Sequence, residues 1–130
     1  MNKDEITKYL NNSKLDLDEV WIICGAAMVL HDLRESTSDI DLGCKKEYFE
    51  KLITNNKNIK TWPDGMRSID FDENIEIFEE WNIKENNQIS GVKVSSLKDL
   101  LNQKKGLNRE KDKFDIKILE EKIKEKRIDI

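Results

Sequence analysis

Two short strand-like segments, residues 20–24 and 39–44, do most to constrain the fold. The first is almost fully apolar and partly β-branched, as expected of a strand that is covered on both faces. Gly25 follows at once and predicts a turn into a short helix at about residues 26–33. In the second segment acidic and apolar residues alternate, which is typical of a strand with one buried face. Strands that alternate with helices indicate a sheet with helices packed against it.

The remaining segments complete the prediction of an α+β (mixed α/β) fold. Apolar residues at helical spacing predict further helices, at residues 3–12, 46–54, 96–107 and 109–126. Strand-like alternation predicts a hairpin and then a short edge strand, at residues 66–71, 75–81 and 92–94. Residues 55–65 are predicted to be rich in turns. We therefore expect a small mixed sheet of about four to five strands with helices packed against it, in a single domain spanning residues 1–130.

Composition narrows the classes of function. The chain of 130 residues has the size of one domain, and its formal net charge of −4 excludes a general nucleic-acid-binding protein. The charge is unevenly distributed, because residues 104–127 carry ten Lys or Arg and six Asp or Glu, whereas the rest carry 13 and 21. A basic C-terminal region fits a phosphate-bearing partner, although the solvated face of a long helix explains it equally well.

The sequence contains no feature that predicts export or a membrane span. No basic segment precedes an apolar one at the start, and no apolar run approaches the length of about eighteen residues that a bilayer requires, so a cytoplasmic protein is expected. Cys24 and Cys44 lack CxxC spacing and are interpreted as reduced, partly buried thiols. Trp62 and Trp81 lie near predicted strand ends and are interpreted as core or rim packing rather than as base-stacking platforms.

Asp39 and Asp41 are the first candidates for chemistry. Side chains two apart in a strand share a face, with Cα atoms about 6.6 Å apart, so both carboxylates point the same way. Two neighbouring carboxylates resist ionisation unless cations hold them, and their hard oxygens suit Mg²⁺ or Mn²⁺. Two such ions, about 3.5 to 4 Å apart, stabilise the attacking and leaving oxygens in phosphoryl displacement. By itself, however, this spacing is also common on exposed strand faces.

Other residues fit a site around these two acids. Gly25, between a strand and a helix, would allow backbone N–H groups to approach an anion, although an ordinary turn explains the glycine equally well. A third carboxylate is expected from a neighbouring strand, where Glu76 alternates with apolar residues. Asp70 and Asp72 alternate in the same way and remain alternatives.

The C-terminal region holds a further set of candidates. Lys104 continues an apolar stripe and is therefore predicted to face the body of the domain, where it either extends out to solvent or reaches a phosphate. Asp112 and Asp115 open the last helix, whose positive end favours carboxylates. Phe114 and Ile118 lie on the side of that helix opposite its other apolar residues, so a partner subunit is one candidate for contacting them.

Taken in order, GAAMVLHDLREST, SDIDL and the segment from Ser96 to Ile116 form a recognisable pattern. The combination resembles the minimal nucleotidyltransferases of the DNA polymerase β-like superfamily. The closer likeness is to the branch with the AbiEii-type toxins and related uncharacterised bacterial proteins. The matching positions are Gly25, Arg34, Thr37, Asp39, Asp41, Leu42, Ser96, Leu97, Asp99, Leu100, Lys104, Arg109, Lys111, Asp112, Asp115 and Ile116.

The resemblance implies roles for these residues. Asp39 and Asp41 would bind metal, with Glu76 where the family usually has a third Asp. Lys104 and Asp112 would line the nucleotide site. The nucleotide and its phosphates would also bind in the segment GAAMVLHDLREST, at Gly25, Ala26, Arg34 and Thr37. Two positions depart from the family, because Ala26 replaces a Ser or Gly and Glu76 is one methylene longer than Asp.

The expected function is therefore that of a nucleotidyltransferase that uses Mg²⁺ or Mn²⁺, with two ions. It would move a nucleoside monophosphate from a nucleoside triphosphate to an acceptor hydroxyl and release pyrophosphate. A tRNA end, a protein side chain and a small molecule are all compatible acceptors, and a homodimer or a partner protein is compatible too. The alternative is a catalytically silent module of the same fold that binds a partner, such as half of a toxin–antitoxin pair. A purely structural α/β protein remains a third reading.

Overall fold

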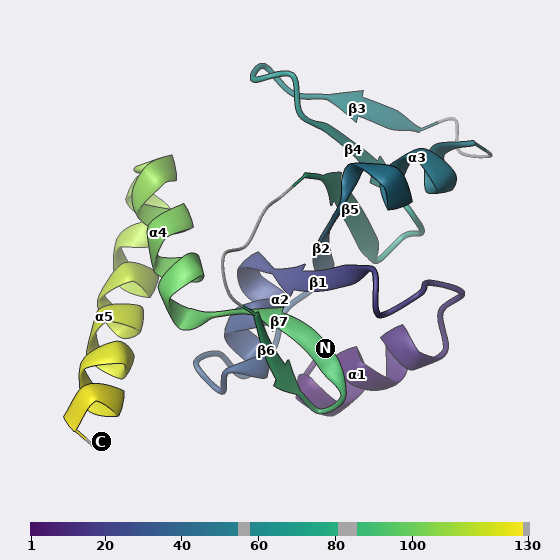
Figure 1. Ribbon diagram of the computed structural model, residues 1–130. Coiled ribbons are helices and arrows are strands. Elements are labelled where there is room, and N and C mark those ends of the chain that lie inside the picture. The colour runs from purple at the N-terminus through teal and green to yellow at the C-terminus, as the bar shows by residue number, and fades with distance from the viewer. Residues whose placement is uncertain (55–57, 81–85, 129–130) are drawn as a thin grey trace.

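The computed structural model describes residues 1–54, 58–80 and 86–128 and contains five α-helices around a mixed sheet (Figure 1). The helices are α1 (Lys3–Asn11), α2 (Cys24–Leu30), α3 (Lys46–Ile53), α4 (Leu97–Leu107) and α5 (Lys113–Ile128), with a 3-10 turn η1 (Glu110–Asp112) before α5. The strands are β1 (Val20–Ile23), β2 (Ile40–Cys44), β3 (Ile59–Thr61), β4 (Arg67–Asp70), β5 (Ile75–Glu79), β6 (Asn86–Ile89) and β7 (Val92–Ser95). The class is thus α+β, as expected.

The sheet is larger than predicted, with seven strands among the described residues instead of four to five, in the order β3-β4-β5-β2-β1-β7-β6. The two strands that the sequence did not indicate, β3 and β6, are the edge strands. β3 lies in the stretch that was predicted to be turns, and all three of its residues are exposed. Edge strands with exposed side chains have no alternation of buried and polar residues, so the pattern that identifies a strand is missing.

The order of strands also corrects the position of β7. It was predicted as an edge strand, but it pairs in parallel with β1 and antiparallel with β6, so it lies inside the sheet. The parallel pairing of β2 with β5 sets Asp41 opposite Glu76. Because side chains on adjacent paired positions share a face, this register determines which acids can meet. Trp81, the predicted end of the β5 strand, lies outside the described residues.

Two of the helices, α1 and α4, begin at side-chain caps. Asn2 and Glu5 form a capping box at the start of α1, with each side chain accepting a hydrogen bond from the other residue's backbone N–H. The Ser96 hydroxyl accepts a hydrogen bond from the Asp99 backbone N–H at 3.1 Å, which confirms the predicted start of α4. Such local hydrogen bonds depend only on residues a few positions apart, so these boundaries are readable from sequence.

One hydrophobic core joins the sheet to the helices. Alternate residues of β2, Ile40 and Leu42, are fully buried in this core, and Ile75 and Ile77 of β5 accompany them. All five helices add buried side chains, namely Ile6, Leu10, Ala26, Ala27, Met28, Val29, Leu30, Phe49, Leu97, Leu100 and Leu119. Because strand side chains alternate, Asp41 points to the opposite face of the sheet. That face carries the candidate chemistry.

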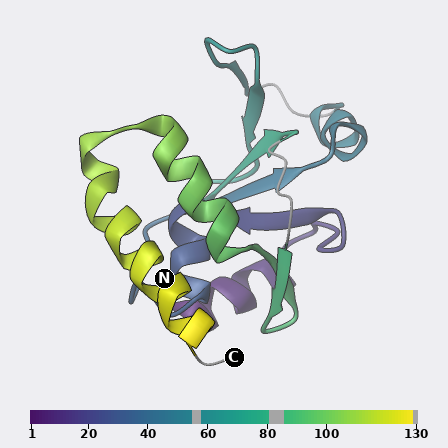
Figure 2. The same ribbon diagram turned by 60° about the vertical axis from the view of Figure 1, so that its left-hand side comes forward.

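Helices α4 and α5 lie side by side as an antiparallel pair in both views (Figures 1 and 2). The pair stands at one side of the molecule, and the β3–β4 hairpin stands at another (Figure 1). In the described part of the chain, none of the helices is both long and apolar enough to cross a bilayer.

Candidate active site

The acidic side of the site is built by β2 and β5. Asp39 immediately precedes β2, and Asp41 is its second residue. On one side Asp41 pairs with Glu76 of β5, and on the other it pairs with Ile23, two residues before Gly25. Because strands lie about 4.8 Å apart, Asp41 and Glu76 are close neighbours on one face. The structure therefore places both acids beside the strand-to-helix turn.

The pKa of Asp41 reflects the burial of its carboxyl group and the acids close to it. Burial, followed by the neighbouring carboxylates of Asp39 and Glu76, raises its pKa from 3.8 to about 6 in total, while Lys60 acts in the opposite direction. Burial and like charge both disfavour the ionised form. The cluster of Asp39, Asp41 and Glu76 is here called the acidic cluster. Its negative charge is incompletely compensated by the protein itself.

The two alternatives for the third acid have other partners. Asp72 belongs to the β4–β5 turn, where its Oδ1 accepts hydrogen bonds from the backbone N–H groups of Asn74 and Ile75, at 2.8 and 2.9 Å. Its Oδ2 accepts a bond from the Tyr9 hydroxyl at 2.8 Å. Asp70 lies opposite Glu76 in the register and forms an ion pair with Lys60 at 3.3 Å. Glu76 is therefore the acid nearest to Asp41 along the paired strands.

The acidic cluster suits a hard divalent cation by its chemistry, since all three side chains supply carboxylate oxygens. No group of three or more His, Cys, Asp or Glu side chains in residues 1–54, 58–80 and 86–128 is arranged to hold a metal ion. Glu76 Oε2 accepts a hydrogen bond from Ser68 Oγ at 2.8 Å and lies 3.6 Å from Lys60 Nζ. One carboxylate oxygen of Glu76 is thus already engaged by neighbouring side chains.

Glycine is favoured at position 25 because neighbouring side chains approach its Cα closely, and not because the backbone has a positive φ. A Cβ at this position would lie 2.7 Å from Arg34 Nη1 and 3.3 Å from Thr37 Oγ1. Both side chains come from the loop that leads into β2, and the Thr37 hydroxyl also donates a hydrogen bond to the Asp39 carbonyl at 3.2 Å. Ala26 is buried in the core, 1% exposed. Arg34 and Thr37 therefore border the turn, whereas Ala26 presents little surface to a ligand.

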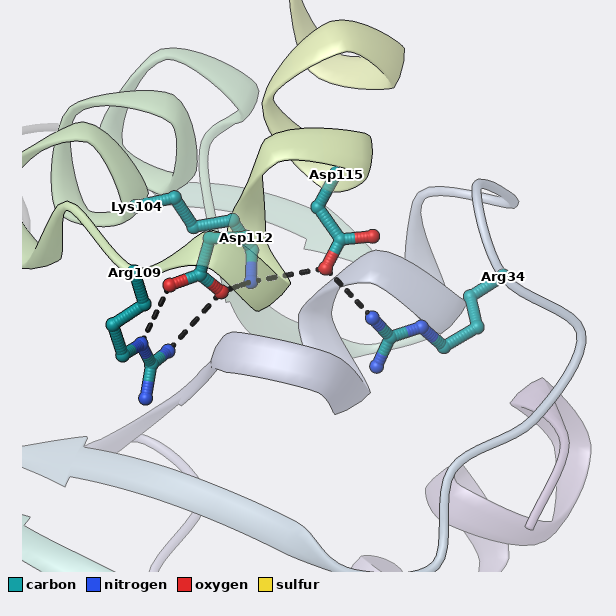
Figure 3. A network of polar contacts seen from close by, with 5 residues as sticks. All are labelled: Arg34, Lys104, Arg109, Asp112 and Asp115. Carbon is teal, nitrogen blue, oxygen red and sulfur yellow. Dashed lines mark hydrogen bonds and ion pairs between the residues drawn. The ribbon is translucent and has the colours of Figure 1, made fainter.

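The C-terminal side of the site is a network of ion pairs (Figure 3). Lys104 Nζ lies 3.3 Å from Asp112 Oδ1 and 3.2 Å from Asp115 Oδ2. Asp112 also receives hydrogen bonds from Arg109, the shorter of them 2.6 Å from Nε to Oδ2. Asp115 accepts one from Arg34 Nη2 at 2.8 Å. These five residues are called the ion-pair network below.

The network bears on the predictions for Lys104. The residue faces the body of the domain, 8% exposed, so it does not extend out to solvent, and two aspartates hold it at the cleft. That Lys104 reaches a phosphate stays a prediction. Hydrogen bonds from Arg109, together with the charge of Lys104, lower the pKa of Asp112. The same pairing raises the pKa of Arg109. Burial of Asp112 is tolerated because its charge is compensated.

The acidic cluster and the ion-pair network face one cleft of about 780 Å³. The cleft lies between the β3–β4 hairpin, the strand-to-helix turn and the turn that joins α4 to α5. Every residue predicted for the site lines it except Ala26. Its complete lining is Cys24, Gly25, Arg34, Thr37, Ser38, Asp39, Asp41, Trp62, Pro63, Asp64, Met66, Glu76, Phe78, Lys104, Leu107, Arg109, Lys111, Asp112 and Asp115.

Two cleft residues were not foreseen as such. Trp62 was interpreted as core or rim packing; it is 44% exposed, packs against Phe78 and lines the cleft. Cys24 has a positive φ of 56°, a strained conformation for a residue with a side chain, at the point where β1 enters α2. Burial raises the pKa of this thiol to about 12, so it is not a reactive thiolate at neutral pH. Neither local pattern nor composition could have indicated these two features.

Comparison with known proteins returned no match of the sequence to a family model. It likewise returned no similar curated protein and no similar solved structure.

Proposed function

We propose that the protein is a metal-dependent nucleotidyltransferase, which moves a nucleoside monophosphate from a nucleoside triphosphate to an acceptor hydroxyl. The observation that carries this proposal is the register of β2 and β5. It puts Asp41 beside Glu76, with Asp39 two residues away, in a cleft that also contains the ion-pair network. The raised pKa of Asp41 indicates negative charge that a bound cation would compensate.

The acids would hold Mg²⁺ or Mn²⁺. When bound, such a cation supplies charge neutralisation at the α-phosphate and activation of the attacking oxygen. In the transfer, the acceptor oxygen would form a bond to the α-phosphorus and lose its proton, while the bond to the β-phosphate oxygen breaks and pyrophosphate leaves. Asp39, Asp41 and Glu76 would position the reacting phosphate by holding its counter-ions.

The basic residues would hold the remaining phosphates. Arg34 lies against Gly25 and is 37% exposed on its side chain, and Arg109 is 44% exposed, so both present N–H donors to the cleft. Lys111 is exposed at the cleft lining. Arginine donors match phosphate oxygens well in geometry. Lys104 and Asp112 would act mainly by fixing the wall that carries these arginines, since they are buried in pairs.

Label transfer tests the proposal directly. Purified protein would be incubated with Mg²⁺, cell extract and each of four nucleoside triphosphates labelled at the α-phosphate. We expect the extract to acquire label, and Asp39→Asn and Asp41→Asn to abolish the transfer. Asp18→Asn removes the same charge from an exposed acid outside the cleft lining, so it serves as the matched control and should keep activity.

A second candidate, a catalytically silent binding module with this fold, is favoured by the Glu76 contacts. Its carboxylate is engaged by Ser68 and Lys60, and the described acids are not arranged around a cation. Calorimetry with Mn²⁺ and a nucleoside triphosphate separates the two candidates. Absence of label transfer together with absence of any metal or nucleotide binding would refute the enzyme and favour the module.

A further inference from the structure

The β3–β4 hairpin gives one side of the cleft an apolar and aromatic surface. Trp62, Pro63 and Met66 of the hairpin line the cleft together with Phe78 of β5, and Trp62 is 44% exposed. Its ring and that of Phe78 have centroids 6.1 Å apart and planes inclined by 31°. An exposed, planar side chain supported from behind by a second ring is suited to stacking. From sequence, Trp62 was interpreted as core or rim packing rather than as a base-stacking platform.

The hairpin turn fixes the position of Trp62. Its backbone N–H donates to the Met66 carbonyl at 2.8 Å, and its carbonyl accepts from the Gly65 N–H at 2.9 Å. Gly65 has a φ of 89°, which a three-residue hairpin loop requires at its last position. Pro63 and Asp64 occupy the first two positions of that loop, and the Asp64 carboxylate accepts from the Met66 N–H at 2.9 Å. Two backbone hydrogen bonds, one side-chain hydrogen bond and the positive φ of Gly65 therefore fix the loop. This orders the tryptophan before any ligand binds.

A chain of hydrogen bonds connects this tryptophan to the acidic cluster. Trp62 Nε1 donates to Ser68 Oγ at 2.9 Å, and Ser68 Oγ donates to Glu76 Oε2 at 2.8 Å. Ser68 is fully buried, so the indole is held by an ordered partner. The single polar atom of the indole is thus occupied, and what remains for a ligand is the ring face. Such a face recognises a flat ring by stacking and not by hydrogen bonds.

We propose that Trp62 forms the subsite for the nucleobase of the bound nucleoside triphosphate. The inference rests on the proposed function, and it follows from the arrangement of three surfaces within one cleft. The aromatic surface stands at one side and the acidic cluster beside it, while Arg109 and Lys111 lie on the α4–α5 turn. Because Trp62 is linked through Ser68 to Glu76, a base on Trp62 would bring the α-phosphate of the same nucleotide to the neighbouring acidic cluster. Stacking accepts every base, so the subsite supplies affinity with little base preference.

Binding measurements on Trp62 variants test this assignment. Trp62→Leu removes the ring but keeps an apolar side chain, and Trp62→Phe keeps a ring. Phe114→Leu is the matched control, because Phe114 is 72% exposed and does not line the cleft. Urea unfolding would verify that each variant is folded. Calorimetry would then measure the affinity for ATP and for inorganic tripolyphosphate, both with Mg²⁺.

We expect Trp62→Leu to weaken ATP binding at least about fivefold, the lower end of what base stacking contributes, and to leave tripolyphosphate binding unchanged. Trp62→Phe should recover most of the ATP affinity, and Phe114→Leu should bind like the wild type. Quenching of tryptophan fluorescence by ATP should be largely lost in Trp62→Phe.

The two proposals fail in different ways. If wild-type protein binds ATP and tripolyphosphate equally well, or if Trp62→Leu binds ATP as tightly as the wild type, the base subsite is refuted and the proposed function stands. If neither ATP nor tripolyphosphate binds the wild-type protein in the presence of Mg²⁺, the proposed function is refuted and the base subsite with it.

Discussion

The two charged regions of the cleft, the ion-pair network and the acidic cluster, differ in how their carboxylates are compensated. In the ion-pair network, Asp112 is surrounded by cations and its pKa is lowered. In the acidic cluster, Asp41 is surrounded by other acids and its pKa is raised to about 6. In the first arrangement each charge has a partner within the protein, so that removing one partner would leave a buried charge uncompensated. The second costs stability and is worthwhile only if a ligand supplies the missing positive charge. Charged residues that line one cleft can therefore have different purposes.

The largest effect is expected where the network is broken. Asp112→Ala leaves Lys104 buried with Asp115 as its remaining partner and removes the contacts of Arg109. Truncating one partner of a buried pair costs about 3 kcal/mol in the free energy of unfolding. Urea denaturation would measure it. Glu110→Gln is the control, since the ion pair of Glu110 with Lys113 is exposed and worth at most about 0.5 kcal/mol. A loss below about 1 kcal/mol for Asp112→Ala would show that the network does not anchor the α4–α5 pair.

The acidic cluster should respond in the opposite direction. Asp41→Asn removes a carboxylate that is difficult to ionise, so in metal-free buffer at pH 7.5 we expect the free energy of unfolding to rise by about 1 to 2 kcal/mol. The value is smaller than the full shift in pKa implies, because cleft water screens the charge. The same variant should lose cation binding. Destabilisation by Asp41→Asn would mean that the carboxylate has a partner in the protein, which would remove the contrast between the regions.

The pH dependence of these two acids distinguishes them further. The pKa of Asp41 is higher in the folded state than its usual 3.8. Its contribution to the free energy of unfolding is therefore fully present below pH 3.8 and is lost as the pH rises through about 6. The pKa of Asp112 is lowered, so its contribution is present above its usual value and is lost as the pH falls through the folded-state pKa. Hence the gain from Asp41→Asn should vanish as the pH falls from 6 toward 3.8, and this should be visible in urea titrations over that range with a chelator present.

Gly25→Ala tests how the two regions are joined. The added Cβ would lie 2.7 Å from Arg34 Nη1, so the guanidinium must move and its ion pair with Asp115 weakens. Because Arg34 is a flexible side chain, we expect a loss of only about 1 kcal/mol. In an Arg34→Ala background the same glycine substitution should cost less, by about 0.5 kcal/mol or more. Additive losses in this cycle would show that the side chains do not compete for the space beside Gly25.

The smallest effect on stability is expected at Lys60. Its contacts with Asp70 and Glu76, at 3.3 and 3.6 Å, are exposed, so Lys60→Gln should change the free energy of unfolding by less than about 0.5 kcal/mol. The lysine nevertheless offsets some of the charge in the acidic cluster. Its loss should therefore strengthen Mn²⁺ binding by about threefold in calorimetry. Weaker Mn²⁺ binding would place the cation elsewhere.

Prediction from sequence succeeded where the information was local. The alternation in residues 39–44 and the helical spacing around Lys104 placed these residues on the correct faces, because backbone geometry fixes the repeat of each element. It failed for β3 and β6, whose exposed side chains carry no alternation. It also gave no partner for Lys104, because the partners depend on how α4 folds back on α5.

The candidate site shows the same division. Sequence pattern selected Asp39, Asp41 and Glu76, and it left Asp70 and Asp72 open as the third acid. The pairing of β2 with β5 places Glu76 next to Asp41, whereas the Asp72 side chain accepts backbone hydrogen bonds within the β4–β5 turn. The hydrogen bonds that link Trp62 to Glu76 through Ser68 arise only when three strands are side by side.

By itself, the sequence determined the periodic elements and the caps of α1 and α4, since each depends on residues a few positions apart. The tertiary structure alone decided which charges are compensated. Arg34 forms an ion pair with Asp115, 81 positions away in the sequence. Lys104 forms ion pairs with two acids that lie beyond the connection between α4 and α5. The energy of a charge depends on the groups that surround it and on its removal from water, and neither is set before the chain is folded.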